Sequence, residues 1–188
     1  GVTGDITATG GIKGASVARQ GTDGLAGTGT APTVSILTTQ DEIITTVKID
    51  LTGLGQSNDI GDVIGKSSVN NAYMFTYAAA THGVFHKIEI SCVELPTATN
   101  ALLDFDLIAH DTTTLTYSGD ASAGTSMTAM NGDIALGETY QSYDGASAVV
   151  GQPTAGQAIY LCEGATSTNQ QLFTGGMLIV KFFGHKSF

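Results

Sequence analysis

GVFHKIEISCVEL (residues 83–95) is the stretch of sequence that decides the fold. Its side chains alternate in character, because Ile88, Ile90 and Cys92 are apolar and the residues between them are polar. Successive side chains of a β-strand point to opposite faces, whereas a helix repeats its apolar residues every three or four positions. The stretch therefore predicts a strand with one buried face and one solvated face.

The same alternation occurs on both sides of this stretch. EIITTVKIDLTGL (42–54) sets Val47, Ile49 and Leu51 against polar neighbours, and LLDFDLIAH (102–110) does the same with Leu103, Phe105 and Leu107. Further strands are expected at 33–40, 72–78, 113–118, 157–164 and 176–185, separated by turn-forming spacers. About eight strands of this kind are typical of two antiparallel sheets packed face to face. We expect an all-β, antiparallel β-sandwich of jelly-roll-like form.

Two spacers have a helical character. Residues 57–65 carry Asn58 or Asp59 as a possible N-cap before a run of apolar residues, and residues 130–141 carry Asp133 near their start. We expect a short helix in each, although glycines weaken the second. The predicted core contains Val47, Ile49, Leu51, Ile88, Ile90, Cys92, Leu103, Phe105, Leu107, Ile179 and Phe182.

Composition narrows the possible functions. The formal net charge is −10 and only 13% of the residues are charged. Nucleic-acid binding needs clustered Lys and Arg to replace the counterions of phosphates, so a nucleic-acid partner is not expected. The chain has no apolar run long enough for a transmembrane helix and no signal-peptide pattern, so a membrane partner is not expected either.

The first 31 residues differ from the rest of the chain. They contain nine glycines and few large apolar side chains, so they bury too little surface to fold alone. We expect two parts, an extended N-terminal arm (1–31) and a β-sandwich domain (32–188). A passive tail is the alternative to an arm that binds a neighbouring subunit. The candidate anchors of a binding arm are Ile6, Ile12, Val17 and Leu25.

Four segments resemble the virion structural proteins of tailed bacteriophages, particularly marine ones. They are TTVKIDLTGL (45–54), NDIGDVIG (58–65), GVFHKIEISCVELP (83–96) and GGMLIVKFFGH (175–185). The resemblance implies a non-enzymatic virion protein, most simply a decoration (cement) protein that binds and stabilises the capsid exterior. It also implies a homotrimer, with the major capsid protein or other virion proteins as partners. A tail or fibre component is an alternative within the same class.

No convincing set of catalytic, cofactor-binding or metal-binding residues is found. His82 and His86 would lie about 13 Å apart on a strand, too far to share a metal. Asp104 and Asp106 are expected on a solvated strand face, with a Ca²⁺ site or a glycosidase acid pair as alternatives. Cys92 and Cys162 are interpreted as buried hydrophobic residues, with a disulfide as the alternative. A carbohydrate-binding β-sandwich remains a further functional alternative.

Overall fold

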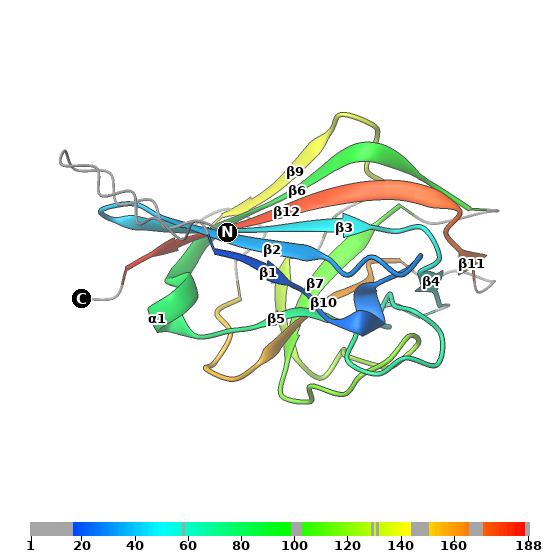
Figure 1. Cartoon of the computed structure of the whole chain (residues 1–188), viewed down its shortest axis with the longest axis horizontal. Helices are drawn as coiled ribbons and strands as arrows, with labels where there is room; N and C mark the ends of the chain where they lie inside the picture. The colour runs from blue at the N-terminus through cyan, green and yellow to red at the C-terminus, as the bar shows by residue number, and fades with distance from the viewer. Residues whose placement is uncertain are drawn as a thin grey trace, which may run out of the picture.

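The computed structural model describes residues 17–57, 59–98, 103–128, 130, 132–143, 151–165 and 171–186. Two antiparallel sheets dominate it, with the larger along one side of the molecule and the smaller along the other (Figure 1). The all-β prediction is confirmed. The larger sheet has, in spatial order, β1 (Val17–Gln20), β2 (Thr33–Thr38), β3 (Glu42–Asp50), β12 (Gly175–His185), β6 (Val84–Thr97) and β9 (Thr139–Tyr143).

The smaller sheet and the remaining elements are short. Its strands, again in spatial order, are β5 (Tyr73–Thr76), β10 (Ala158–Glu163), β7 (Phe105–His110) and β8 (Thr125–Thr128). A two-stranded ribbon of β4 (Gly55–Gln56) and β11 (Gln171–Leu172) lies apart from both sheets. The helical elements are a 3₁₀ turn, η1 (Asp23–Leu25), and a single α-helical turn, α1 (Ala79–His82).

The strands of the larger sheet bury one face, as the alternation predicts. Val47 and Ile49 of β3 are fully buried, and so is Phe182 of β12. They belong to one core cluster together with Phe105 and Leu107 of β7, so this core draws on both sheets. Burying such aliphatic and aromatic side chains contributes about 1.5–3 kcal/mol each.

Nine of the predicted core residues are buried, and two are not. Ile179 is partly exposed because Leu178, Val180 and Phe182 occupy the inward positions of β12, which leaves Ile179 on the outer face. Leu103 is only partly buried at the edge of the core, just before β7 begins. Cys92 and Cys162 are both buried and both free thiols, in different clusters.

The smaller sheet is covered on both of its faces. Every residue of β10 is buried, and so are Phe105 to Ala109 of β7. On the side away from the main core, Ile108, Tyr160 and Cys162 pack in a second cluster with Val63 and with residues of neighbouring loops. Loops therefore shield this sheet from water as a third layer.

Residues 17–31 pack against the body of the same chain. β1 pairs with β2, placing Val17 opposite Ile36, and Leu25 is fully buried in the main core. Leu25 is therefore a core residue of its own subunit and not an anchor for a neighbour. Val17 lies in the edge strand β1, whereas Ile6 and Ile12 lie outside the described residues.

Three predicted elements are wrong. Residues 57–65, expected to be helical, form a turn and isolated bridges, with a positive φ of 87° at Gly61. The described residues of 130–141 form turns and the start of β9, which pairs with β6. Residues 113–118, expected as a strand, form a loop with a turn in which Ser118 has a φ of 64°.

Candidate functional site

The outer face of the larger sheet carries apolar, hydroxyl and charged side chains in cross-strand rows. One cross-strand row runs Leu37, Ile44, Phe183 and Lys87 over β2, β3, β12 and β6. The next row is formed by Ser35, Thr46, Lys181, Glu89 and Gln141. Leu37 is 42% exposed, and Ile44 and Phe183 are half-buried. The face thus combines an apolar band with a neighbouring band of hydroxyl and charged groups.

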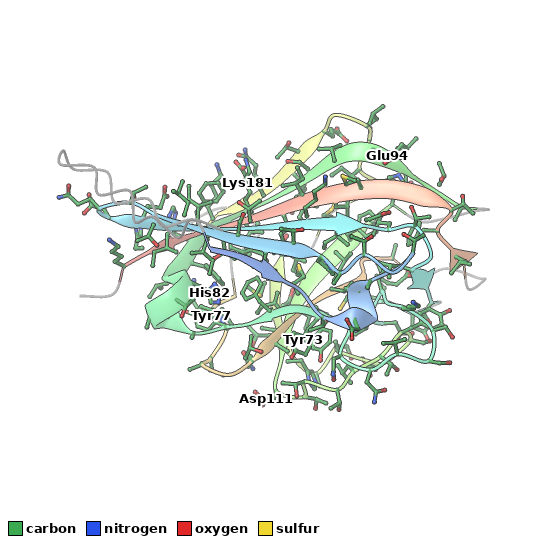
Figure 2. All side chains as sticks on the ribbon, in the orientation of Figure 1. Tyr73, Tyr77, His82, Glu94, Asp111 and Lys181 are labelled. Carbon is green, nitrogen blue, oxygen red and sulfur yellow. The ribbon has the colours of Figure 1, made fainter. Side chains whose placement is uncertain are left out.

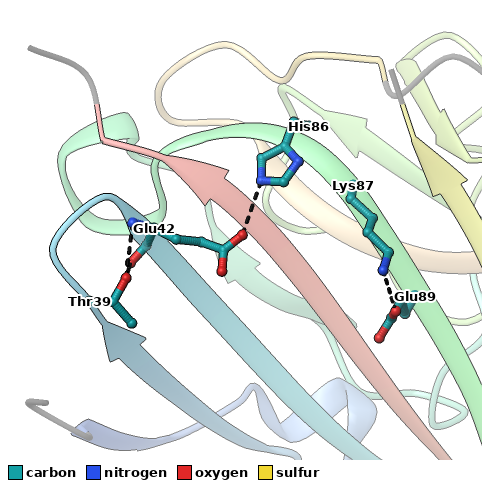
Figure 3. A network of polar contacts seen from close by, with 5 residues as sticks. All are labelled: Thr39, Glu42, His86, Lys87 and Glu89. Atoms are coloured by element: carbon teal, nitrogen blue, oxygen red, sulfur yellow. Dashed lines mark hydrogen bonds and ion pairs between the residues drawn. The ribbon is translucent and has the colours of Figure 1, made fainter. Parts of the chain in front are cut away.

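Two pairs of charged or ionisable groups lie on this face, Lys87 with Glu89 and His86 with Glu42 (Figure 3). The Lys87 ammonium lies 2.6 Å from Glu89 and 4.9 Å from the centre of the Phe183 ring. Gln141 of β9 donates a hydrogen bond of 2.9 Å to Glu89. Figure 2 shows Lys181 and Glu94 on this side of the molecule and Asp111 on the opposite side. Pairs at the surface of a sheet add little stability, so they chiefly shape the surface.

A β-bulge brings His86 onto the same face. The β6–β12 register shifts so that Phe183 lies opposite Lys87 and Gly184 lies opposite Phe85, which leaves His86 as the extra residue. The His86 ring stacks on His185 with 4.0 Å between ring centres, and its Nε2 lies 3.3 Å from a Glu42 carboxylate oxygen. These groups form the end of the outer face nearest α1.

The structure separates the two histidines considered together in the sequence. His82 ends α1 and is buried, with its Nδ1 3.0 Å from the Thr45 hydroxyl and its ring against Phe75. His86 lies on the outer face of β6. No group of three His, Cys, Asp or Glu side chains that could hold a metal ion occurs among the described residues. No described helix is long and apolar enough to cross a membrane.

Asp104 and Asp106 are buried, which corrects the prediction of a solvated strand face. Asp106 accepts a 2.9 Å hydrogen bond from the Met130 amide, and Asp104 accepts one of 3.1 Å from the Gly132 amide. Desolvation raises the pKa of Asp106 to about 6, and the nearby Asp104 adds to the rise. The pair fastens the strand to the segment after β8.

A second group of buried acids was not predicted. Glu163, the last residue of β10, is fully buried, and Asp62 is 9% exposed. Backbone hydrogen bonds attach residues 61–64 to the end of β10: the Glu163 amide donates to Asp62, and the Ile64 amide donates to Leu161. Val63 forms a bridge with Cys162, which sets Asp62 opposite Glu163 at the next position. Such opposed side chains lie about 4.5–5.5 Å apart at Cβ.

Burial is the main cause of the raised pKa values of Glu163 and Asp62. The pKa of Glu163 is raised to about 8, chiefly by desolvation and in part by the negative charge of Asp62. The backbone amide of Ser57 acts to lower the pKa of Glu163, but it does not form a hydrogen bond of normal geometry with the Glu163 carboxylate. Desolvation also raises the pKa of Asp62, against a hydrogen bond from the Ser57 side chain. Strand alternation gave no signal for this pair, because Asp62 lies in a segment expected to be helical.

The sequence matches no described protein family, and neither a curated protein nor a solved structure shows significant similarity to it.

Proposed function

We propose that the protein is a non-enzymatic virion structural protein, a decoration protein that binds the outside of a capsid and stabilises it as a homotrimer. The observation that carries the proposal is the outer face of the larger sheet. Its row of Leu37, Ile44 and Phe183 offers the apolar and aromatic anchors of an interface core, and the neighbouring row of hydroxyl and charged groups matches the polar rim of such a core.

The all-β architecture is a second, more general argument for this role. Sheets with one core-facing side and one outward side offer a rigid surface on which protein contacts can be placed. We propose that the two sheets form a jelly-roll-like sandwich. Three of the four segments that resemble virion proteins overlap β3, β6 and β12, the central strands of the proposed contact face.

The first test is the state of association. We expect the full chain to sediment as a homotrimer at micromolar concentration, and Phe183→Asp to weaken self-association or attachment to the particle because it places a charge in the apolar row. The control is Leu172→Asp, since Leu172 is 59% exposed on β11, away from this face. A monomeric wild type that also forms no trimer on a particle would contradict the proposal, and tubes or fibres by negative-stain microscopy would favour a tail component.

We propose that the N-terminal arm contributes to the same assembly. Only the residues before β1 are meant, because Val17 belongs to β1 and Leu25 belongs to the core. Deleting residues 2–16 is expected to leave the unfolding temperature of the body unchanged and to weaken assembly or attachment. The full deletion of 2–31 is the contrasting variant, because it removes Leu25 from the core and should destabilise the fold. Unchanged assembly of the shorter variant, measured by sedimentation and particle binding, would show that these residues are a passive tail.

A further inference from the structure

Oxygen-bearing side chains gather around the end of β10. Glu163 and Asp62 lie opposite each other, because Val63 bridges Cys162 and the Glu163 amide donates to the Asp62 carbonyl. Ser57 lies close enough to both carboxyl groups to lower their pKa values. The Ser57 hydroxyl is also 2.7 Å from that of Ser118. The Tyr117 hydroxyl lies close enough to both carboxyl groups for their charges to raise its pKa, although desolvation is the larger cause.

Glu163 is unpartnered at the centre of this group. Its side chain is fully buried, and neither carboxylate oxygen has a hydrogen-bond partner in the described part of the chain. A buried polar group without a partner costs about 1–3 kcal/mol, and an uncompensated charge costs more. The two carboxylate oxygens of Glu163 therefore need a bound partner to offset this cost.

The charges that act on Glu163 and Asp62 are also of one sign. The charge of Asp62 raises the pKa of Glu163, and the charges of Asp59 and Asp120 raise the pKa of Asp62, so each disfavours the ionised form. Residues 118–121 flank residues 61–63 on the side away from β10, with Asp120 bridged to Asp62. The two ion pairs found among the described side chains, His86–Glu42 and Lys87–Glu89, both lie on the larger sheet. Acids arranged in neighbouring strand positions repel each other unless a counter-charge lies between them.

We propose that Glu163 and Asp62 form a binding site for a divalent cation that prefers oxygen ligands, with Ca²⁺ the best-suited ion. Ca²⁺ takes six to eight oxygens, and it accepts neutral hydroxyl, carbonyl and water ligands beside one or two carboxylates. Glu163 and Asp62, both bidentate, would supply four oxygens and the Ser57 hydroxyl a fifth, so backbone carbonyls or water would complete the coordination. The cation would occupy the place that a proton on Glu163 otherwise fills.

The cation site does not depend on the virion role, because a bound ion would attach the segment around Asp62 and the loop carrying Ser118 to the end of β10. The ion would thus hold the covering layer on the smaller sheet. A chain that does not bind Ca²⁺ would contradict the cation site alone, and a chain that does not assemble would contradict the virion role alone.

The test is Ca²⁺ titration of the full chain after treatment with EDTA, by calorimetry and by thermal unfolding at neutral pH. We expect one ion per chain, and a rise of the unfolding temperature of roughly 5–10 °C at one hundred times the Kd. Glu163→Gln keeps the size of the side chain and removes its charge, so it should lose at least ten-fold in Ca²⁺ affinity and most of the temperature rise. Glu94→Gln, an exposed glutamate on the larger sheet, is the matched control and should respond like the wild type.

Three results would overturn the proposal. The first is a wild type whose unfolding temperature and heat signal do not respond to Ca²⁺ or Mg²⁺ at about 10 mM, above the weakest Kd of protein Ca²⁺ sites, about 10⁻³ M. The second is a Glu163→Gln variant that binds Ca²⁺ as tightly as the wild type, because the ion would then lie elsewhere. The third is an equal loss of binding in Glu94→Gln.

Discussion

Replacing Phe105 by alanine is expected to lower the free energy of unfolding by about 3–5 kcal/mol. Phe105 is fully buried at the start of β7, and its ring lies 6.3 Å from that of Phe173, centre to centre. It belongs to the core cluster shared by the two sheets, so the space that it leaves cannot be filled by water or by an exposed neighbour. Urea unfolding followed by circular dichroism measures the change.

The comparison is Phe183→Ala on the outer face. Phe183 is half-buried and contacts solvent and Lys87, so its removal leaves an open surface instead of a cavity. We expect a loss of about 1 kcal/mol or less for this variant, as for most surface substitutions. Equal losses in the two variants would show that β7 does not contribute its inner face to the core.

In the metal-free chain, the free energy of unfolding is expected to fall as the pH rises from about 4.5 to about 8. The pKa of Glu163 moves from 4.5 to about 8 on folding, so over this range the folded chain keeps a proton that the unfolded chain loses. The stabilisation is complete below pH 4.5 and is lost as the pH passes 8. Each pKa unit corresponds to about 1.4 kcal/mol, which sets an upper limit of about 5 kcal/mol.

Glu163→Gln should remove this dependence. The difference in unfolding free energy between the variant and the wild type, measured in EDTA by urea titration at several pH values, should grow in favour of the variant between pH 4.5 and 8. Asp106 gives a slope of the same sign between pH 3.8 and about 6, but it is present in both proteins and cancels in the difference. A difference that stays constant across the whole range would mean that the folded chain does not shift the Glu163 pKa.

The strands that alternate cleanly were predictable from the sequence alone. β3 and β6 each place apolar residues at every second position over a long run, so the core face of the larger sheet follows from the pattern. The short strands β1, β8 and β9 were missed because their residues are mostly small, polar or hydroxyl-bearing. Their place in a sheet is set by pairing with a longer strand rather than by their own apolar content.

The two acidic sites show where the pattern misleads. Asp104 and Asp106 alternate with Phe105 and Leu107, as on a solvated strand, but loops cover that face and the backbone amides of Met130 and Gly132 each donate to one of the two carboxylates. Glu163 is the closing residue of an apolar strand, and Asp62 joins it only through the pairing of residues 61–64 with β10. Such long-range contacts leave no periodic trace in the sequence.

The position of β12 has a consequence for how the chain reaches its fold. This strand is the last in sequence of the twelve strands in the described residues, yet it lies between β3 and β6 and joins the two halves of the larger sheet. During synthesis, residues 42–97 emerge long before the partner that bridges them, and their inner apolar edges stay open until residues 175–185 arrive. Pairings this distant in sequence are slow to form and leave strand edges open to aggregation. The larger sheet is therefore expected to close only after translation has passed residue 185, with β12 inserting between β3 and β6 as the last step.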